Sequence, residues 1–198
     1  MATHSAEAVQ YEPTSFGVPD KKLGMWVFLA SEVMFFTGLI GSYIILRWGA
    51  SSSWPAPGEV LAIPVTAANT FLLICSSVAM VKAFAAIEEG DQKHLKLWLL
   101  ATIVMGASFV GVQAYEYTHL IHEGFLPSSG LYGSTFYAMT GFHGFHVTMG
   151  VLCMIWVLGK AMRGHYTKEH HEGVEAIGLY WHFVDLVWII LFTIVYLI

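Results

Sequence analysis

Five hydrophobic runs dominate this sequence, and each is long enough to cross a lipid bilayer as an α-helix. A helical span needs about 20 apolar residues to cross roughly 30 Å of hydrocarbon. The connections between the runs are brief and leave no room for a soluble domain. We therefore predict an all-α, polytopic membrane bundle of five transmembrane helices over residues 23–198, preceded by a segment at 1–22. The expected spans are about 23–46, 63–87, 97–115, 132–158 and 176–197.

Composition agrees with this prediction and limits the partners. Of the 198 residues, 56% are hydrophobic and 12% are charged, whereas soluble domains carry about 25% charged residues. A net charge of −5 with only 9 Lys and Arg residues offers no continuous cationic surface, which argues against nucleic acid as a partner. Cys75 and Cys153 lie inside hydrophobic runs and in no CxxC or CxxCH pattern, so we expect neither a disulfide framework nor attached haem.

Basic residues are distributed unevenly between the two sides of the predicted bundle. The side that includes the N-terminal segment holds eight of them, and the other side holds only Arg47. Cytoplasmic loops carry an excess of Lys and Arg, so we expect a cytoplasmic N-terminus and a C-terminus on the outside. The eight residues are Lys21, Lys22, Lys82, Lys93, Lys96, Lys160, Arg163 and Lys168.

Five ionisable residues interrupt the hydrophobic runs near mid-membrane: Glu32, His143, His146, His182 and Asp185. Such a group costs about 2.5 to 3.5 kcal/mol in the bilayer, so each should face protein or a water-filled cavity. His143 and His146 are three residues apart, as are His182 and Asp185, so each pair shares a helix face. Two interpretations are open: a transition-metal site, or a hydrogen-bonded polar layer that locks the helices together.

Other polar and small residues carry further expectations. A buried carboxylate such as Glu32 either relays protons or accepts hydrogen bonds from its neighbours. Near the predicted outer surface, we expect Glu116 and Arg47 to form a structural ion pair. Small residues let helix backbones approach closely, and the third and fourth runs hold them at Gly106, Gly111, Thr140, Gly144 and Thr148.

A histidine cluster precedes the last hydrophobic run. It comprises His165, His170 and His171, with Glu169 and Glu172 beside them. A solvated loop is the default interpretation. Alternatively, histidines can buffer protons at a surface near pH 7 or bind a metal ion.

Four motifs resemble subunit III of the haem-copper cytochrome c oxidases. They are SEVMFFTG at 31–38, EGDQKH at 89–94, YGSTFYAMTGFHGFHVTMG at 132–150 and LYWHFVDLVW at 179–188. They occur in the family's order, and the similarity extends over nearly all of residues 23–198.

The resemblance implies a non-catalytic subunit of a terminal oxidase in aerobic respiratory electron transport. In that family, haem and copper belong to a catalytic subunit I and a copper-bearing subunit II, and subunit III holds no redox metal. Subunit III stabilises the complex, carries membrane phospholipid and supports proton uptake on the cytoplasmic side. By resemblance, the chain lies in the bacterial plasma membrane. Its five intramembrane residues, Glu32, His143, His146, His182 and Asp185, would form a structural network or a subunit contact.

The resemblance also assigns surface roles and leaves alternatives. Lys160, Arg163 and His165 match a basic stretch that would contact lipid headgroups, whereas proton buffering by His165, His170 and His171 is expected from imidazole chemistry alone. Members with seven spans cradle lipid between their first two helices and the other five. This chain begins at what would be their third helix, so that lipid site would be open or completed by another subunit. Alternatives are subunit III of a quinol oxidase or of a nitric-oxide-reduction relative, a stand-alone proton or metal transporter, and a self-contained metalloenzyme.

Overall fold

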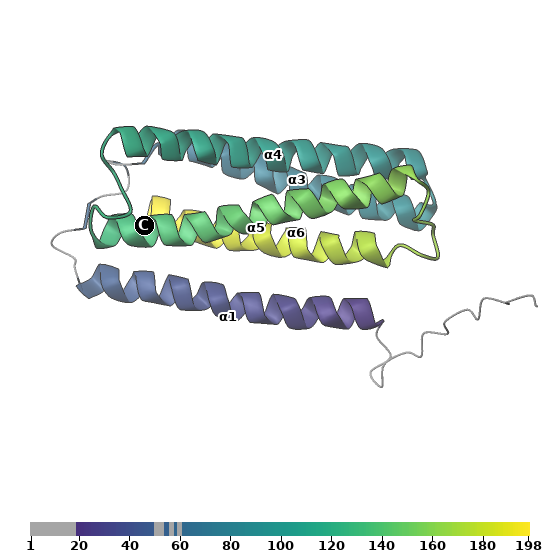
Figure 1. Cartoon of the computed structure of the whole chain (residues 1–198), viewed down its shortest axis with the longest axis horizontal. Helices are drawn as coiled ribbons and strands as arrows, with labels where there is room; N and C mark the ends of the chain where they lie inside the picture. The colour runs from purple at the N-terminus through teal and green to yellow at the C-terminus, as the bar shows by residue number, and fades with distance from the viewer. Residues whose placement is uncertain (1–18, 50–53, 56–57, 59–60) are drawn as a thin grey trace, which may run out of the picture.

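The computed structural model describes residues 19–49, 54, 55, 58 and 61–198, so most of the predicted 1–22 segment lies outside it. Five long α-helices follow one another along the described chain (Figure 1). All five are long and apolar enough to cross a membrane, which confirms the predicted all-α bundle of five membrane-length helices. They are α1 (Asp20–Gly49), α3 (Ile63–Glu89), α4 (Gln92–His122), α5 (Leu131–Met162) and α6 (Glu172–Phe192), followed by the π-helical turn η1 (Thr193–Leu197).

Helix α1 is peripheral and helix α6 is central. Figure 1 shows α3, α4, α5 and α6 grouped together, with α1 running along one side of the group. Helix α1 packs mainly against α5 and α6. In the most apolar stretch of α1, only 6% of the residues are buried within the chain, compared with 50% in the corresponding stretch of the last helix. Most of the apolar surface of α1 therefore faces away from this chain.

Two tryptophans of α6 form the centre of the core. Trp181 and Trp188 are each only 1% exposed. The indole N–H of Trp181 donates to Oγ of Ser76 at 2.9 Å, and that of Trp188 donates to Oγ1 of Thr70 at 2.9 Å. A buried indole N–H usually needs such a partner, and here both partners come from α3. The two hydrogen bonds therefore fix α6 against α3 while the rings fill the bundle.

Glycines allow the helices to approach these large side chains. A Cβ atom added at Gly106 of α4 would lie 2.6 Å from Cη2 of Trp181, and one at Gly144 of α5 would lie 2.7 Å from Oε1 of Gln113. The close packing predicted at Gly106 and Gly144 is confirmed. The same prediction for Gly111 is wrong, because nothing lies within 4 Å of a Cβ atom there.

Side-chain hydrogen bonds join α4 to α5 beside Gly144. Nε2 of Gln113 donates to the backbone carbonyl of Thr140 at 3.0 Å, and the Tyr117 hydroxyl lies 2.6 Å from Oγ1 of Thr140. Thr140 is fully buried, as its predicted place between helices requires. Thr148 is exposed instead, and its hydroxyl donates to a carbonyl of its own helix.

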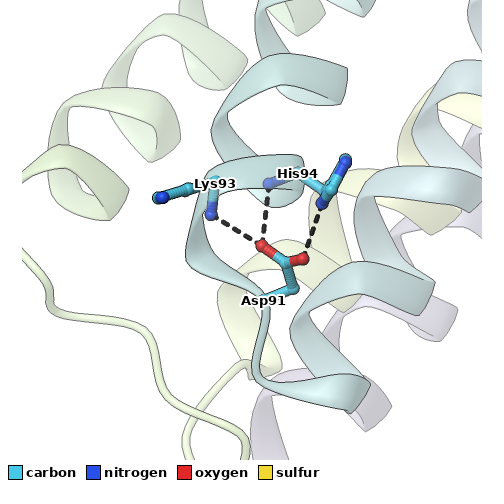
Figure 2. Close-up of polar contacts among 3 residues, drawn as sticks. All are labelled: Asp91, Lys93 and His94. Atoms are coloured by element: carbon cyan, nitrogen blue, oxygen red, sulfur yellow. Dashed lines mark hydrogen bonds and ion pairs between the residues drawn. The ribbon is translucent and has the colours of Figure 1, made fainter.

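A glycine and an aspartate build the turn between α3 and α4. Gly90 ends α3 in the left-handed conformation, with φ of 85°, which glycine adopts without steric cost. The Asp91 carboxylate then caps α4 by accepting hydrogen bonds from the backbone N–H groups of Lys93 and His94 at 3.0 and 3.1 Å and from Nδ1 of His94 at 2.6 Å (Figure 2). The bond from the His94 side chain is the main cause that lowers the pKa of Asp91.

Candidate functional site

Glu32 and His146 meet inside the bundle, between α1 and α5. Nε2 of His146 lies 3.0 Å from Oε2 of Glu32, and the two side chains are 13% and 16% exposed. Nδ1 of His146 lies 2.7 Å from the carbonyl oxygen of Phe142, which can only accept a hydrogen bond, so Nδ1 carries a hydrogen. The Nε2 to Oε2 contact is an ion pair when the imidazole is protonated. Glu32 and His146 therefore form one polar contact that joins α1 to α5.

Side chains from three helices surround the Glu32–His146 pair. The ring of Phe36 on α1 lies 5.2 Å from the imidazole of His146 and 6.3 Å from the ring of Phe183 on α6. The hydroxyl of Tyr180, also on α6, donates to the backbone carbonyl of His146 at 2.9 Å. The Phe36 ring therefore packs against the imidazole, and the Tyr180 hydrogen bond joins α6 to the backbone of α5 at this residue.

An apolar cavity of about 450 Å³ lies beside the same pair. Its walls come from α1, α5 and α6 and include Phe28, Met149 and Tyr180, while Glu32 and His146 also line it. Apolar cavities with a few well-placed polar groups are typical of binding sites for apolar molecules. The arrangement can hold an apolar chain next to a contacting pair of acidic and basic side chains.

His143 occupies a different environment in the core. It is fully buried, and its ring stacks on Trp188 with 4.7 Å between the ring centroids and meets Phe109 edge-on at 6.0 Å. Neither ring nitrogen has a hydrogen-bond partner among the described residues. His143 therefore contributes packing to the aromatic core and makes no contact with the carboxylate of Glu32.

His182 and Asp185 lie at the interface of α6 with α3. Nδ1 of His182 is 2.6 Å from the hydroxyl oxygen of Ser77. Asp185 is 7% exposed, and its Oδ1 atom has no hydrogen-bond partner in the part of the chain that the structure describes. Both polar groups therefore face α3 rather than the Glu32–His146 pair.

The five predicted intramembrane residues thus fall into three separate sets of contacts. Among the described residues, no group of three or more His, Cys, Asp or Glu side chains could hold a metal ion. The spacing of these residues left a transition-metal site open as an interpretation, but the described part of the chain does not bring enough ligands together for one. A role for these residues as a structural network or subunit contact stays a prediction.

The basic and histidine residues before α6 lie at the end of α5 and in the connection that follows. Nζ of Lys160 lies 3.8 Å from the ring centroid of Trp156. His171 packs edge-on against Phe84 of α3, with 5.6 Å between the centroids. The exposed side chains are those of Arg163, His165 and His170. Their predicted roles in headgroup contact and proton buffering stay predictions.

The predicted ion pair between Glu116 and Arg47 is wrong. Oε1 of Glu116 instead accepts hydrogen bonds from the hydroxyl groups of Thr66 and Tyr196 at 3.1 and 3.3 Å. Arg47 donates to backbone carbonyl groups at the end of the last helix, including that of Ile194 at 3.5 Å. Glu116 is therefore bound by neutral hydroxyl groups, and Arg47 by backbone carbonyl groups, instead of by each other.

Two ion pairs between α1 and α6 were missed by sequence reasoning. Nζ of Lys22 lies 2.5 Å from Oε1 of Glu175, and Nζ of Lys21 lies 2.9 Å from Oε2 of Glu172. From the sequence, Lys21 and Lys22 were considered only as members of the basic excess on one side of the bundle, and no acidic partner was predicted for them. Lys22 and Glu175 are 153 residues apart, and no local pattern links residues at that separation.

Comparison with known proteins decides the family. Residues 6–198 match the family model of cytochrome c oxidase subunit III. The chain belongs to this family. It is 41% identical over 181 residues to cytochrome c oxidase subunit 3 of Thermostichus vulcanus, which covers 90% of this chain and 88% of the relative. It is 44% identical over 184 residues to cytochrome c oxidase subunit 3 of Synechocystis sp., and the alignment covers 91% of this chain and 77% of the relative. It is 42% identical over 178 residues to a probable cytochrome c oxidase subunit 3 of Nocardia farcinica, and the alignment covers 88% of this chain and 86% of the relative.

Three of the four family motifs of this subunit III meet at the Glu32–His146 pair. The motif at 31–38 contributes Glu32 from α1, the motif at 132–150 contributes His146 from α5, and the motif at 179–188 contributes Tyr180 from α6. The fourth motif, at 89–94, builds the turn between α3 and α4. By family, subunit III is a non-catalytic member of the cytochrome c oxidase complex.

Proposed function

We propose that this subunit III stabilises the catalytic subunit I of a terminal cytochrome c oxidase in bacterial aerobic respiration. The family match over residues 6–198 is the observation that carries the proposal, and relatives named cytochrome c oxidase subunit 3 support it. Haem and copper would belong to subunit I and to a copper-bearing subunit II. This chain would supply the membrane surface that holds the complex together.

The exposed face of α1 supports a role in contacts with other subunits or lipid. Trp26, Met34 and Trp48 are 46%, 77% and 79% exposed within this chain. In a bilayer, such a face is covered by acyl chains or by helices of a partner. We propose that subunit I and lipid share this surface.

We also propose that phospholipid occupies the cavity beside Glu32 and His146. Its volume of about 450 Å³ and its apolar walls suit part of an acyl chain. At the end of α5, the positive groups of Lys160 and Arg163 and the side chain of His165 suit contact with phosphate headgroups. Mass spectrometry of lipid retained by the purified complex tests this. A double variant with Lys160→Ala and Arg163→Ala should retain less anionic lipid, and equal retention would contradict the headgroup contact.

A role in proton uptake is the third part of the proposal. His165 and His170 are exposed in the connection before α6, and imidazoles near neutral pH exchange protons readily. The Glu32–His146 pair places an acidic and a basic side chain in contact deeper in the bundle. With the N-terminus in the cytoplasm, as the excess of basic residues on one side favours, the exposed histidines would face the cytoplasm.

Affinity purification from native membranes tests the whole proposal. A tag on this chain should bring down a haem-containing large subunit and a companion chain with a dinuclear copper site. Recovery of the haem-containing subunit without that copper would point to a quinol oxidase or to a relative associated with nitric oxide reduction. Recovery of the chain alone would refute the proposal.

A stand-alone transporter is the alternative from another class. It predicts proton or metal flux in liposomes that contain only this chain, with loss of flux in an Asp185→Asn variant. We expect no flux, because the family places the chain in a larger complex.

A further inference from the structure

A second cavity lies between α3 and α6, next to the Lys22–Glu175 ion pair. Its volume is about 170 Å³, and a liquid water molecule takes about 30 Å³, so several waters fit. Glu175 and His182 line it, and they lie about 10 Å apart along α6 at 1.5 Å per residue. The remaining walls are apolar and come from Met80, Val81, Phe84, Gly178 and Leu179.

Polar groups continue from the cavity toward mid-membrane. Nδ1 of His182 lies 2.6 Å from Oγ of Ser77, which leaves Nε2 as the ring nitrogen available to water in the cavity. The Ser77 hydroxyl is also within electrostatic reach of the Asp185 carboxyl group, although among the described residues its hydrogen bond is the one to His182. Asp185 lies one helical turn beyond His182 and is 7% exposed, with Oδ1 lacking any partner among the described residues.

Asp185 has no cationic partner within this chain's described ion pairs. An unpaired carboxylate costs several kcal/mol in an apolar interior, so the neutral acid is favoured there. Among the described residues, the charged side chain that lines the cavity is Glu175 of α6, which pairs with Lys22 of α1. Lys82 of α3 turns instead to the ring of a tryptophan on α4.

We propose that Asp185 exchanges protons with water at the Lys22–Glu175 end of α6, through this cavity and the His182–Ser77 contact. In the inward step, Nε2 of His182 takes a proton from cavity water and Nδ1 gives its proton to the Ser77 oxygen. The Ser77 hydroxyl proton then moves to the Asp185 carboxylate. One proton enters, the imidazole changes tautomer, and the outward step reverses each transfer. Asp185 thereby becomes a proton reservoir inside the membrane.

This inference deepens the proposed role in proton uptake. Proton exchange at Asp185 does not depend on that role, but the use of the reservoir by the complex rests on it. It is tested by infrared spectroscopy on the complete purified complex. The carbonyl band of protonated Asp185 is isolated as the difference between wild type and Asp185→Asn. If that variant does not assemble, Asp185→Glu, which keeps a carboxylic acid with a shifted carbonyl frequency, assigns the band. In wild type, transfer to heavy water should shift the band within the time of buffer exchange.

Two changes should slow this shift at least tenfold. Val81→Phe fills the cavity without replacing a polar group, because Val81 is one of its apolar wall residues, and His182→Gln removes the imidazole. Val78→Phe is the matched control, because Val78 lies one turn away on α3, is 53% exposed compared with 54% for Val81, and does not line the cavity. We expect the control to exchange at the wild-type rate.

The path is refuted if Val81→Phe and Val78→Phe exchange equally fast, or if protonated Asp185 gives no band. Haem content and oxygen consumption of the same preparations separate this failure from failure of the proposed function. If the complex keeps its haem and its oxygen consumption, and Asp185 exchanges at the wild-type rate in both variants, only the proton path is refuted. Absence of haem-containing partners removes the proposed function.

Discussion

At the scale of single residues, the Glu32–His146 pair shows how a costly polar group becomes stable inside a membrane bundle. Each side chain alone would leave a buried group without a partner, which costs about 1 to 3 kcal/mol. Together they satisfy each other across α1 and α5 at 3.0 Å. Sequence spacing predicted that both residues face protein, but it did not identify them as partners, because periodicity assigns a face and not the helix opposite.

A double-mutant cycle should detect this partnership. Glu32→Ala and His146→Ala should each lower the free energy of unfolding of the purified chain in detergent. The double variant should lose less than the sum, with a coupling of about 1 kcal/mol or more. Glu32→Gln should lose little, because its amide can donate to Nε2, and oxygen reduction by the assembled complex should stay near wild type. Strictly additive losses would show that the two residues act independently.

The capping aspartate gives a pH-dependent prediction outside the membrane. Hydrogen bonds from His94 and from backbone N–H groups lower the pKa of Asp91 from its ordinary value of 3.8. Ionised Asp91 therefore stabilises the fold above that value, and the contribution is lost as pH falls through the lowered pKa. Asp91→Asn keeps an acceptor oxygen but removes the charge. The gap in thermal midpoint between wild type and Asp91→Asn should be largest near neutral pH and close under acid conditions.

Asp91→Ala is the control for the cap itself. It removes both the charge and the acceptor, so its midpoint should remain below that of Asp91→Asn across the pH range. A gap between wild type and Asp91→Asn that stays constant into strong acid would contradict the role of the charge.

At the scale of helices, hydropathy predicted how many there are but not their full length. The third span was expected at 97–115, whereas α4 runs Gln92–His122. Hydropathy detects only the apolar part of a helix, which lies in the hydrocarbon of the bilayer. The backbone hydrogen bonds of the helix extend beyond that part, as far as its capping residues. The start of α4 was readable from Gly90 and Asp91, which are typical of a helix end followed by a helix start. The extension to His122 had no comparable signal.

Helix packing at Gly106 gives the prediction at this scale. Gly106→Ala would place a Cβ atom 2.6 Å from Cη2 of Trp181, so α4 must move away from α6 or the indole must turn. We expect a loss of about 1 to 3 kcal/mol in the free energy of unfolding. Gly111→Ala is the matched control on the same helix, because nothing lies within 4 Å of its added Cβ atom. It should be neutral or slightly stabilising. Equal effects of the two changes would refute the packing argument.

At the scale of the whole molecule, the sequence predicted the fold class and the family but not the contacts between helices. The failed pairing of Arg47 with Glu116 shows why. Both residues were placed correctly near one end of the bundle, and opposite charge suggested a pair. In the structure, Tyr196 and Thr66 reach Glu116 first, because rotation of each helix about its axis decides which neighbours meet.

Orientation in the membrane is a prediction for the whole chain. In a background with Cys75→Ser and Cys153→Ser, single cysteines at Ser128 and Thr167 would report on opposite ends of α5, where both positions are exposed. A membrane-impermeant thiol reagent should label Ser128→Cys in intact cells and Thr167→Cys only after the membrane is opened. The reverse pattern would overturn the cytoplasmic N-terminus.

The docking of α1 on α5 and α6 has a consequence for biosynthesis. Chains are made at roughly 5 to 20 residues per second, so Lys22 precedes Glu175, 153 residues later, by about 8 to 30 s. For most of that interval Glu32 is in or near the membrane before His146 has been made. Helix α1 must therefore wait for α5 and α6, its later partners. The insertion machinery or a helix of another subunit has to shelter its carboxyl group until they arrive.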